Sequence, residues 1–131
     1  MKFDRETYKI IDAAVEVYRN LGTGFMEAVY QEALEKEFAL QKIPFRREIP
    51  LSIYYKTEPL EKKYLPDFVC FDKIIVELRS VQKLAGEHQA QVMNYLKASQ
   101  FEAGLLFNFG AQSLEHKRLI CNPSVCSILP G

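Results

Sequence analysis

The chain has 131 residues, of which 48% are hydrophobic and 26% are charged, a composition typical of one globular domain. Lysine plus arginine and aspartate plus glutamate both number 17, so the zero formal charge excludes a protein held on nucleic acid by bulk electrostatics alone. The most apolar segment, residues 103–111, is too short to cross a bilayer, and the charged first residues lack the apolar run of a signal peptide. We therefore expect a cytoplasmic protein without a membrane partner.

Apolar residues at spacings of three and four predict two N-terminal helices, over residues 5–20 and 26–42. The side chains expected on their buried faces are Tyr8, Ile11, Val15 and Tyr18 in the first helix and Met26, Val29, Ala33 and Phe38 in the second.

Alternating apolar residues then predict a three-strand meander over residues 49–55, 62–71 and 74–81. A helix over residues 86–100 and strands over 105–109 and 117–121 follow. This order predicts an α/β fold class with a mixed α+β sheet, in which strand 74–81 is central and parallel to strand 105–109 across a right-handed crossover. We expect one domain over residues 1–121 and a C-terminal tail over residues 122–131.

The three cysteines, Cys70, Cys121 and Cys126, show no CxxC spacing. We expect them to be free thiols that pack as small hydrophobes, rather than zinc ligands or disulfide partners.

Three charged residues interrupt the apolar runs of the expected strands 62–71 and 74–81: Asp67, Glu77 and Arg79. Glu77 and Arg79 are two apart in a strand and so project from one face. A two-residue turn at residues 72–73 would place Asp67 opposite Leu78, on the wrong face. A three-residue turn at 71–73, or a bulge near Pro66, would place Asp67 opposite Glu77, and we expect one of these two devices.

With that correction, two carboxylates and a guanidinium converge on one face of a hairpin. Adjacent carboxylates repel each other unless a cation lies between them. A hard divalent ion such as Mg²⁺, or Mn²⁺ in its place, accepts such oxygen ligands and activates water for attack on a phosphate. A structural salt bridge between Arg79 and Glu77 or Asp67 is the alternative interpretation of the same spacing.

At this point the sequence resembles a known superfamily. Pro66 and Asp67, followed after nine residues by Glu77, Leu78 and Arg79, resemble the PD-(D/E)XK nuclease-like signature. The predicted element order is similar to its αβββαβ restriction-endonuclease-like core, with an extra N-terminal helix. The pattern Gly24-x-x-Glu27-x-x-Tyr30 resembles the hallmark of the GxxExxY family within that superfamily.

The resemblance implies which residues form the site. Asp67, Glu77 and the backbone carbonyl of Leu78 resemble the metal ligands, and Glu27 resembles a helical acid that reaches the same metal. Gln91-x-x-x-Tyr95 resembles a motif of RecB-like relatives, and the four-residue spacing puts both side chains on one helix face.

One departure from the family pattern is Arg79, which stands where the family has lysine. Arginine cannot act as a base in proteins, although it can orient water and stabilise negative charge. Two functions therefore remain open. The first is a metal-dependent nuclease that cleaves phosphodiester bonds in DNA or RNA. The second is a catalytically inactive nuclease-fold module for binding or assembly, in which Arg79 salt-bridges the former metal site. An exposed edge strand or the tail could also join two copies into a homodimer.

Overall fold

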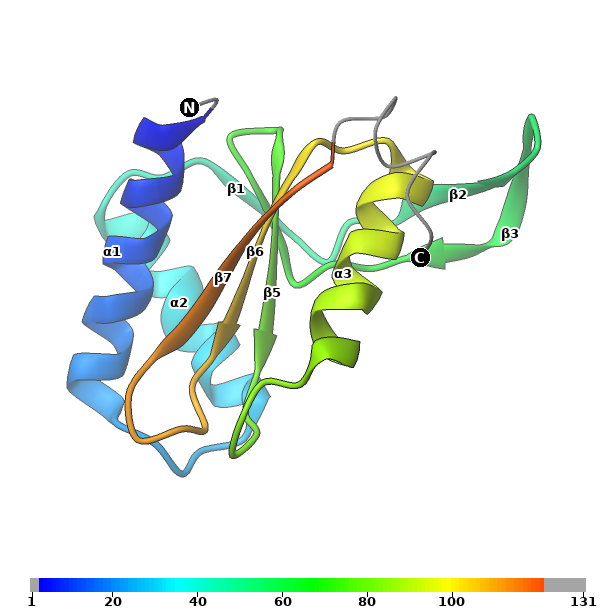
Figure 1. The fold of residues 1–131 in the computed structure, drawn as a ribbon. Coiled ribbons are helices and arrows are strands. Elements are labelled where there is room, and N and C mark those ends of the chain that lie inside the picture. Colours follow the sequence, from blue (N-terminus) through cyan, green and yellow to red (C-terminus); the bar gives the residue numbers. More distant parts are fainter. Residues whose placement is uncertain (1–2, 122–131) are drawn as a thin grey trace.

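The structure of the protein, a computed structural model, describes residues 3–121 (Figure 1). The tail expected over residues 122–131 therefore lies outside the described residues. The elements in chain order are α1 (Asp4–Leu21), α2 (Glu27–Leu40), β1 (Phe45–Arg47), β2 (Leu51–Tyr55), β3 (Glu58–Tyr64), β4 (Phe68–Cys70), β5 (Ile74–Arg79), α3 (Gly86–Ser99), β6 (Ala103–Asn108) and β7 (Glu115–Ile120).

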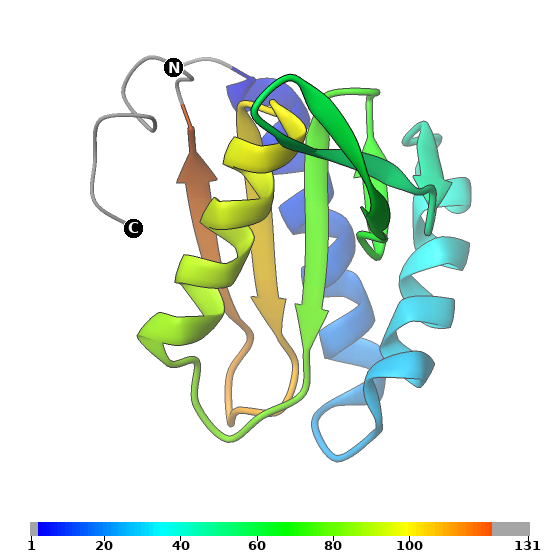
Figure 2. The ribbon, with the colours of Figure 1, turned by 90° about the vertical axis from the view of Figure 1, so that its right-hand side faces the viewer.

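The main sheet has the strand order β1-β4-β5-β6-β7 and is covered on both faces. Helices α1 and α2 lie on one face and α3 lies on the other (Figure 2). β5 and β6 pair in parallel, and the other neighbours in this sheet are antiparallel. The mixed sheet, the central position of β5 and the parallel crossover through α3 are all confirmed.

Strand β5 lies in the interior of the sheet, and helices cover both of its faces. Val76 and Leu78 pack with α1 and α2, whereas Ile75 packs in the second apolar cluster beneath α3. Each of these side chains is at most 1% exposed. A continuous apolar run is what such a doubly covered strand requires, so the buried Glu77 at 7% exposure stands out in it.

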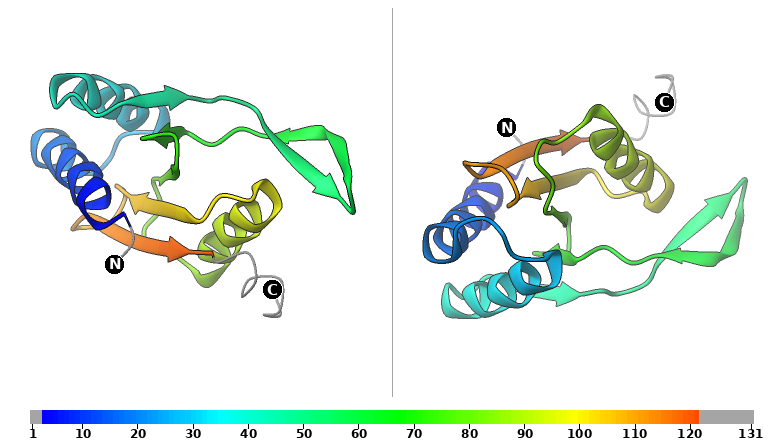
Figure 3. Two further views of the ribbon diagram at one scale, coloured as in Figure 1. Left: turned by 90° about the horizontal axis from the view of Figure 1, so that it is seen from above. Right: turned by 90° about the horizontal axis from the view of Figure 1, so that it is seen from below.

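The expected three-strand meander is wrong in one respect. β2 and β3 form a separate two-stranded ribbon, while β4 pairs with β5 and with the short strand β1, which the sequence did not indicate. The break falls at residues 65–67, where Pro66 lacks the N–H that a continuing ladder would need. In both views of Figure 3 the ribbon extends away from the rest of the protein.

The predicted buried faces of the two N-terminal helices are also partly wrong. Tyr8 is 59% exposed and Met26 is 76% exposed, although Phe38 is buried as expected. The residues that α1 and α2 bury are Thr7, Ile10, Ala13, Ala14 and Val17 in α1 and Tyr30, Gln31, Leu34 and Phe38 in α2. One of the buried α2 side chains, Gln31, is polar, so the apolar pattern alone did not indicate this face.

The expectation of free thiols holds for Cys70, which is buried and free, and is wrong for Cys121, which is disulfide-bonded. Among residues 3–121, no helix combines the length and the apolar character that a membrane span needs.

Candidate functional site

The turn between β4 and β5 decides where the two strand acids lie. Cys70 pairs with Ile74, and Phe68 pairs with Val76, so the turn has three residues, 71–73. Its tight path uses left-handed backbone at Phe71 (φ 56°) and Asp72 (φ 58°). Continuing the register by one residue sets Asp67 opposite Glu77. The expected three-residue turn is therefore present.

Asp67 directly precedes Phe68, the first residue of β4, at the point where the pairing with β5 stops. Its Oδ2 accepts a hydrogen bond from the backbone N–H of Leu78 at 2.8 Å. The carboxylate thus takes the place of a backbone acceptor for β5, beyond the residues that pair with β4. Its Oδ1 accepts from Gln31 Nε2 of α2 at 3.3 Å. Asp67 is therefore held from two elements, the sheet and helix α2.

Glu77 is held by a tyrosine and an arginine. Oε1 accepts a hydrogen bond from the Tyr64 hydroxyl at 2.5 Å, and Oε2 lies 3.4 Å from Arg79 Nη1. Tyr64 is the last residue of β3, so the base of the ribbon contacts the site directly. Glu77 and Arg79 thus share one side of β5, as their spacing predicts.

The proximity of the two acids changes their ionisation. Burial and then the negative charge of Asp67 raise the pKa of Glu77 to about 7, against the lowering effect of Tyr64 and Arg79. Burial also raises the pKa of Asp67, although the Leu78 N–H and Arg79 oppose this. The pair therefore holds a proton under conditions in which ordinary carboxyl groups are ionised.

Arg79 occupies two of the oxygens expected to be metal ligands. Its Nη1 donates to the Leu78 carbonyl oxygen at 2.7 Å as well as contacting Glu77 Oε2. The guanidinium therefore stands where a cation would gather the same oxygens. Its side chain is 20% exposed, so one side of it is open to solvent.

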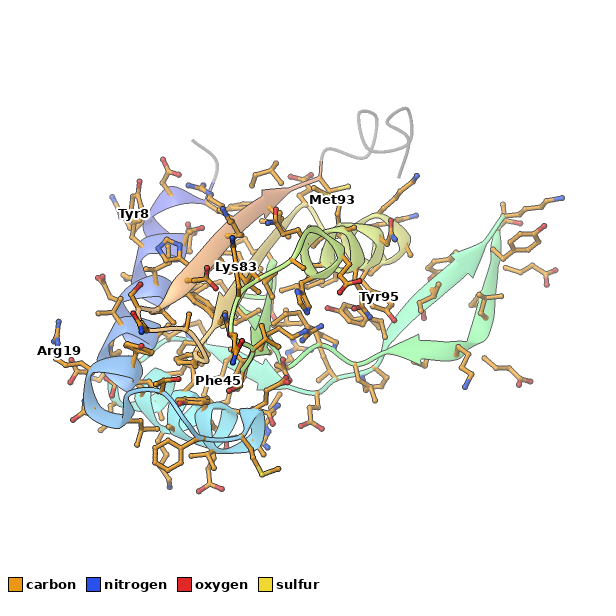
Figure 4. All side chains as sticks on the ribbon, turned by 60° about the horizontal axis from the view of Figure 1, so that its bottom comes forward. Tyr8, Arg19, Phe45, Lys83, Met93 and Tyr95 are labelled. Atoms are coloured by element: carbon orange, nitrogen blue, oxygen red, sulfur yellow. The ribbon has the colours of Figure 1, made fainter. Side chains whose placement is uncertain are left out.

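Helix α3 supplies the remaining wall of this site. Glu77, Arg79, Gln91 and Tyr95 all line a cavity of about 220 Å³ together with residues 63–65 and Val92, which we call the Glu77 cavity. The Tyr95 ring stacks on Tyr64 with centroids 3.8 Å apart. Figure 4 shows Tyr95 between α3 and the base of the ribbon. The structure thus places Gln91 and Tyr95 of α3 in one cavity with Glu77 and Arg79.

Glu27 lies at the first position of α2, apart from the pair formed by Asp67 and Glu77. Partial burial raises its pKa, the charges of Arg79 and His88 lower it, and that of Asp67 raises it, so its carboxylate is close enough to respond to the site. Among residues 3–121, however, no three or more His, Cys, Asp or Glu side chains gather closely enough to hold a metal ion. Glu27 therefore does not join Asp67 and Glu77 in one cluster.

Tyr30 explains the rest of the Gly24-x-x-Glu27-x-x-Tyr30 pattern. Its hydroxyl donates to the Gly22 carbonyl at 2.6 Å and accepts from the Phe25 N–H at 3.3 Å, and its ring stacks on Phe109. Gly24 has φ 111°, a backbone conformation that side chains disfavour. Glycine and tyrosine together fix the loop that places Glu27 at the start of α2.

Two polar residues around Asp67 escaped the sequence reasoning. Gln31 Nε2 donates to Glu48 Oε1 at 3.0 Å as well as to Asp67, and its Oε1 accepts from Arg47 Nη2 at 3.0 Å. Gln31 follows Glu27 by four residues and so shares its helix face, which was the available signal. Glu48 had no signal, because its position depends on strand β1.

Most of the chain matches the model of a known protein family. The model of the PD-(D/E)XK nuclease superfamily matches residues 4–119. The chain belongs to this superfamily.

A solved structure of another protein has a similar fold at low sequence identity. The structure titled "Crystal structure of SSO0001" is similar with a TM-score of 0.56 and 15% identity, over 95% of this chain. The aligned part is 64% of the SSO0001 chain, so this chain spans less than two thirds of that protein. Among curated proteins, none matches the chain significantly.

Proposed function

We propose that this PD-(D/E)XK superfamily member is a metal-dependent nuclease of the GxxExxY family that cleaves phosphodiester bonds in DNA or RNA. The observation that carries the proposal is that the strand register sets Asp67 opposite Glu77 of β5. Both carboxyl groups have raised pKa values there. The negative charge of Asp67 acts on Glu77, and two carboxylates that repel each other favour a cation between them.

The donor set fits a hard divalent ion, Mg²⁺ or Mn²⁺. Asp67, Glu77 and the Leu78 carbonyl would hold it, since all three offer oxygen atoms. Such an ion supplies an activated water and charge neutralisation at the phosphate. Glu27 would act from the rim, through an intervening water or through the substrate.

Arg79 must leave the Leu78 carbonyl for this set to be complete. The long side chain, partly open to solvent, can turn outward and donate to a phosphate oxygen instead. Gln91 and Tyr95 line the same cavity and would contact the phosphate or the attacking water.

The test of the metal site is a calorimetric titration with Mn²⁺. Wild type should bind and Asp67→Asn should not, while Asp12→Asn, an exposed aspartate of α1, should bind as wild type does. Absence of binding to wild type would overturn the proposal.

One observation favours a second candidate function, a binding module without catalysis. Arg79 already neutralises Glu77 and saturates the Leu78 carbonyl, as a salt bridge replacing the metal would. A nuclease assay on Arg79→Lys distinguishes the two functions. The nuclease should keep or gain activity with lysine, whereas the module should show none in either form and should bind Mn²⁺ only after Arg79→Ala.

A further inference from the structure

A second cavity lies at the end of β5 and is lined by Glu27. It has a volume of about 590 Å³ and is lined by residues 23–28, 80–82 and Gly110, and we call it the Phe25 cavity. Residues 80–82 follow β5 directly and Gly110 lies just beyond β6, so the cavity stands at the carboxyl ends of two parallel strands. Ligands of open α/β sheets bind at such ends.

Phe25 is an apolar side chain held in a fixed, half-exposed position at this cavity. The residue is 44% exposed, yet both of its backbone polar groups are bound. Its N–H donates to Tyr30 Oη, and its carbonyl accepts from Ser80 Oγ at 2.9 Å. Its ring meets the Tyr30 ring edge to face, with centroids 6.0 Å apart. An exposed aromatic ring fixed in this way offers a ready stacking surface.

The Phe25 cavity and the Glu77 cavity both lie at the end of β5, since Ser80 lines the first and the preceding residue, Arg79, lines the second. Glu27 lines the Phe25 cavity, and the charges of Asp67 and Arg79 act on Glu27. Arg79 and Glu77 in turn line the Glu77 cavity. The two cavities therefore flank the end of β5, an arrangement that suits a site through which one strand of nucleic acid passes.

We propose that the Phe25 cavity receives an unpaired nucleobase of the substrate, so that the enzyme acts on single-stranded or locally opened nucleic acid. The proposal rests on the function proposed above and adds the substrate class. The carboxylate of Glu27 disfavours a phosphate in this cavity, whereas a neutral base can stack on Phe25 and hydrogen-bond to the amide of Gln82 or to backbone groups. A base paired within a duplex presents no face for such stacking.

The apolar side chains around the loop would also suit a peptide segment of another protein. Met26 and Val29 are 76% and 41% exposed. The position of the cavity beside Glu27 and at the end of β5 favours the nucleobase over the peptide. The experiment below separates the two occupants.

The experiment measures binding rather than cleavage. Fluorescence anisotropy of a short labelled oligonucleotide is recorded with Asp67→Asn as the background, because this variant should not turn the substrate over. Single-stranded DNA, single-stranded RNA and the matching duplexes are compared. We expect at least one single strand to bind about tenfold or more tightly than its duplex.

Substitutions at Phe25 then test the stacking. Phe25→Ala should weaken single-strand binding about tenfold, and Phe25→Trp should restore it. Leu40→Ala is the matched control, since Leu40 is 76% exposed at the other end of α2 and should have no effect. Circular dichroism establishes that each variant is folded.

Equal binding of strand and duplex, or a Phe25→Ala variant that binds like wild type, would refute the nucleobase site. A peptide-binding cavity would give that result. Wild type that still binds Mn²⁺ would then leave the metal-dependent nuclease standing. Conversely, strand preference without Mn²⁺ binding would keep the nucleobase site and refute the nuclease.

Discussion

Replacing Glu77 by glutamine should remove a pH-dependent loss of stability from the protein. Glu77 is 7% exposed, and its pKa rises from 4.5 to about 7 on folding because of burial and the neighbouring Asp67. A raised pKa means that the folded state holds the proton more tightly than the unfolded chain. The associated stability is complete below pH 4.5 and is lost as the pH rises through about 7. At 1.36 kcal/mol per pKa unit, the loss is about 3 kcal/mol.

The assay is urea denaturation of wild type and Glu77→Gln from about pH 4 to about pH 8, with the difference in unfolding free energy plotted against pH. The difference should shift by about 3 kcal/mol in favour of the variant across this range. Saturating Mn²⁺ should remove the loss of stability of wild type with rising pH, because the cation replaces the proton between the acids. It should not change the stability of Glu77→Gln. A difference that stays constant with pH would show that Glu77 titrates normally and would refute this account of the buried pair.

Three further substitutions test the supporting contacts. Gln31→Leu removes the amide that holds Asp67 and should weaken Mn²⁺ binding by about tenfold in calorimetry; unchanged affinity would mean that the amide does not position the acid. Tyr30→Phe loses two hydrogen bonds and should lower the unfolding free energy by about 1–3 kcal/mol in urea, and an unchanged midpoint would contradict the anchoring role. Gly110→Ala would place a Cβ 2.4 Å from the Val81 carbonyl oxygen, so its melting temperature should fall; a variant as stable as wild type would show that this segment readily shifts.

The sequence predicted the features that depend on counting along one strand or one turn. The parity between Asp67 and Glu77 follows from the length of the turn between them, and the shared face of Glu77 and Arg79 follows from the two-residue period. The central, doubly covered β5 was visible in its apolar run.

The features that the sequence did not predict depend on contacts distant in the chain or on polar groups in the core. Gln31 reaches Asp67 across 36 positions, and no local pattern marks a pairing of that kind. The buried face of α2 was missed because Gln31 is polar, and it is buried with hydrogen bonds to Asp67, Glu48 and Arg47. The break of the second strand was visible only as Pro66, near which a bulge was one of the two devices expected.

The ribbon of β2 and β3 divides into two parts with different freedom to vary. At its base, Tyr64 is bonded to Glu77 and stacked on Tyr95, so the length of the segment from residue 64 to Asp67 is fixed by the acid pair. At its tip, residues 55–58 are exposed and far along the ribbon from the acids (Figure 3). Insertions there would lengthen the arm without altering the chemistry at its root.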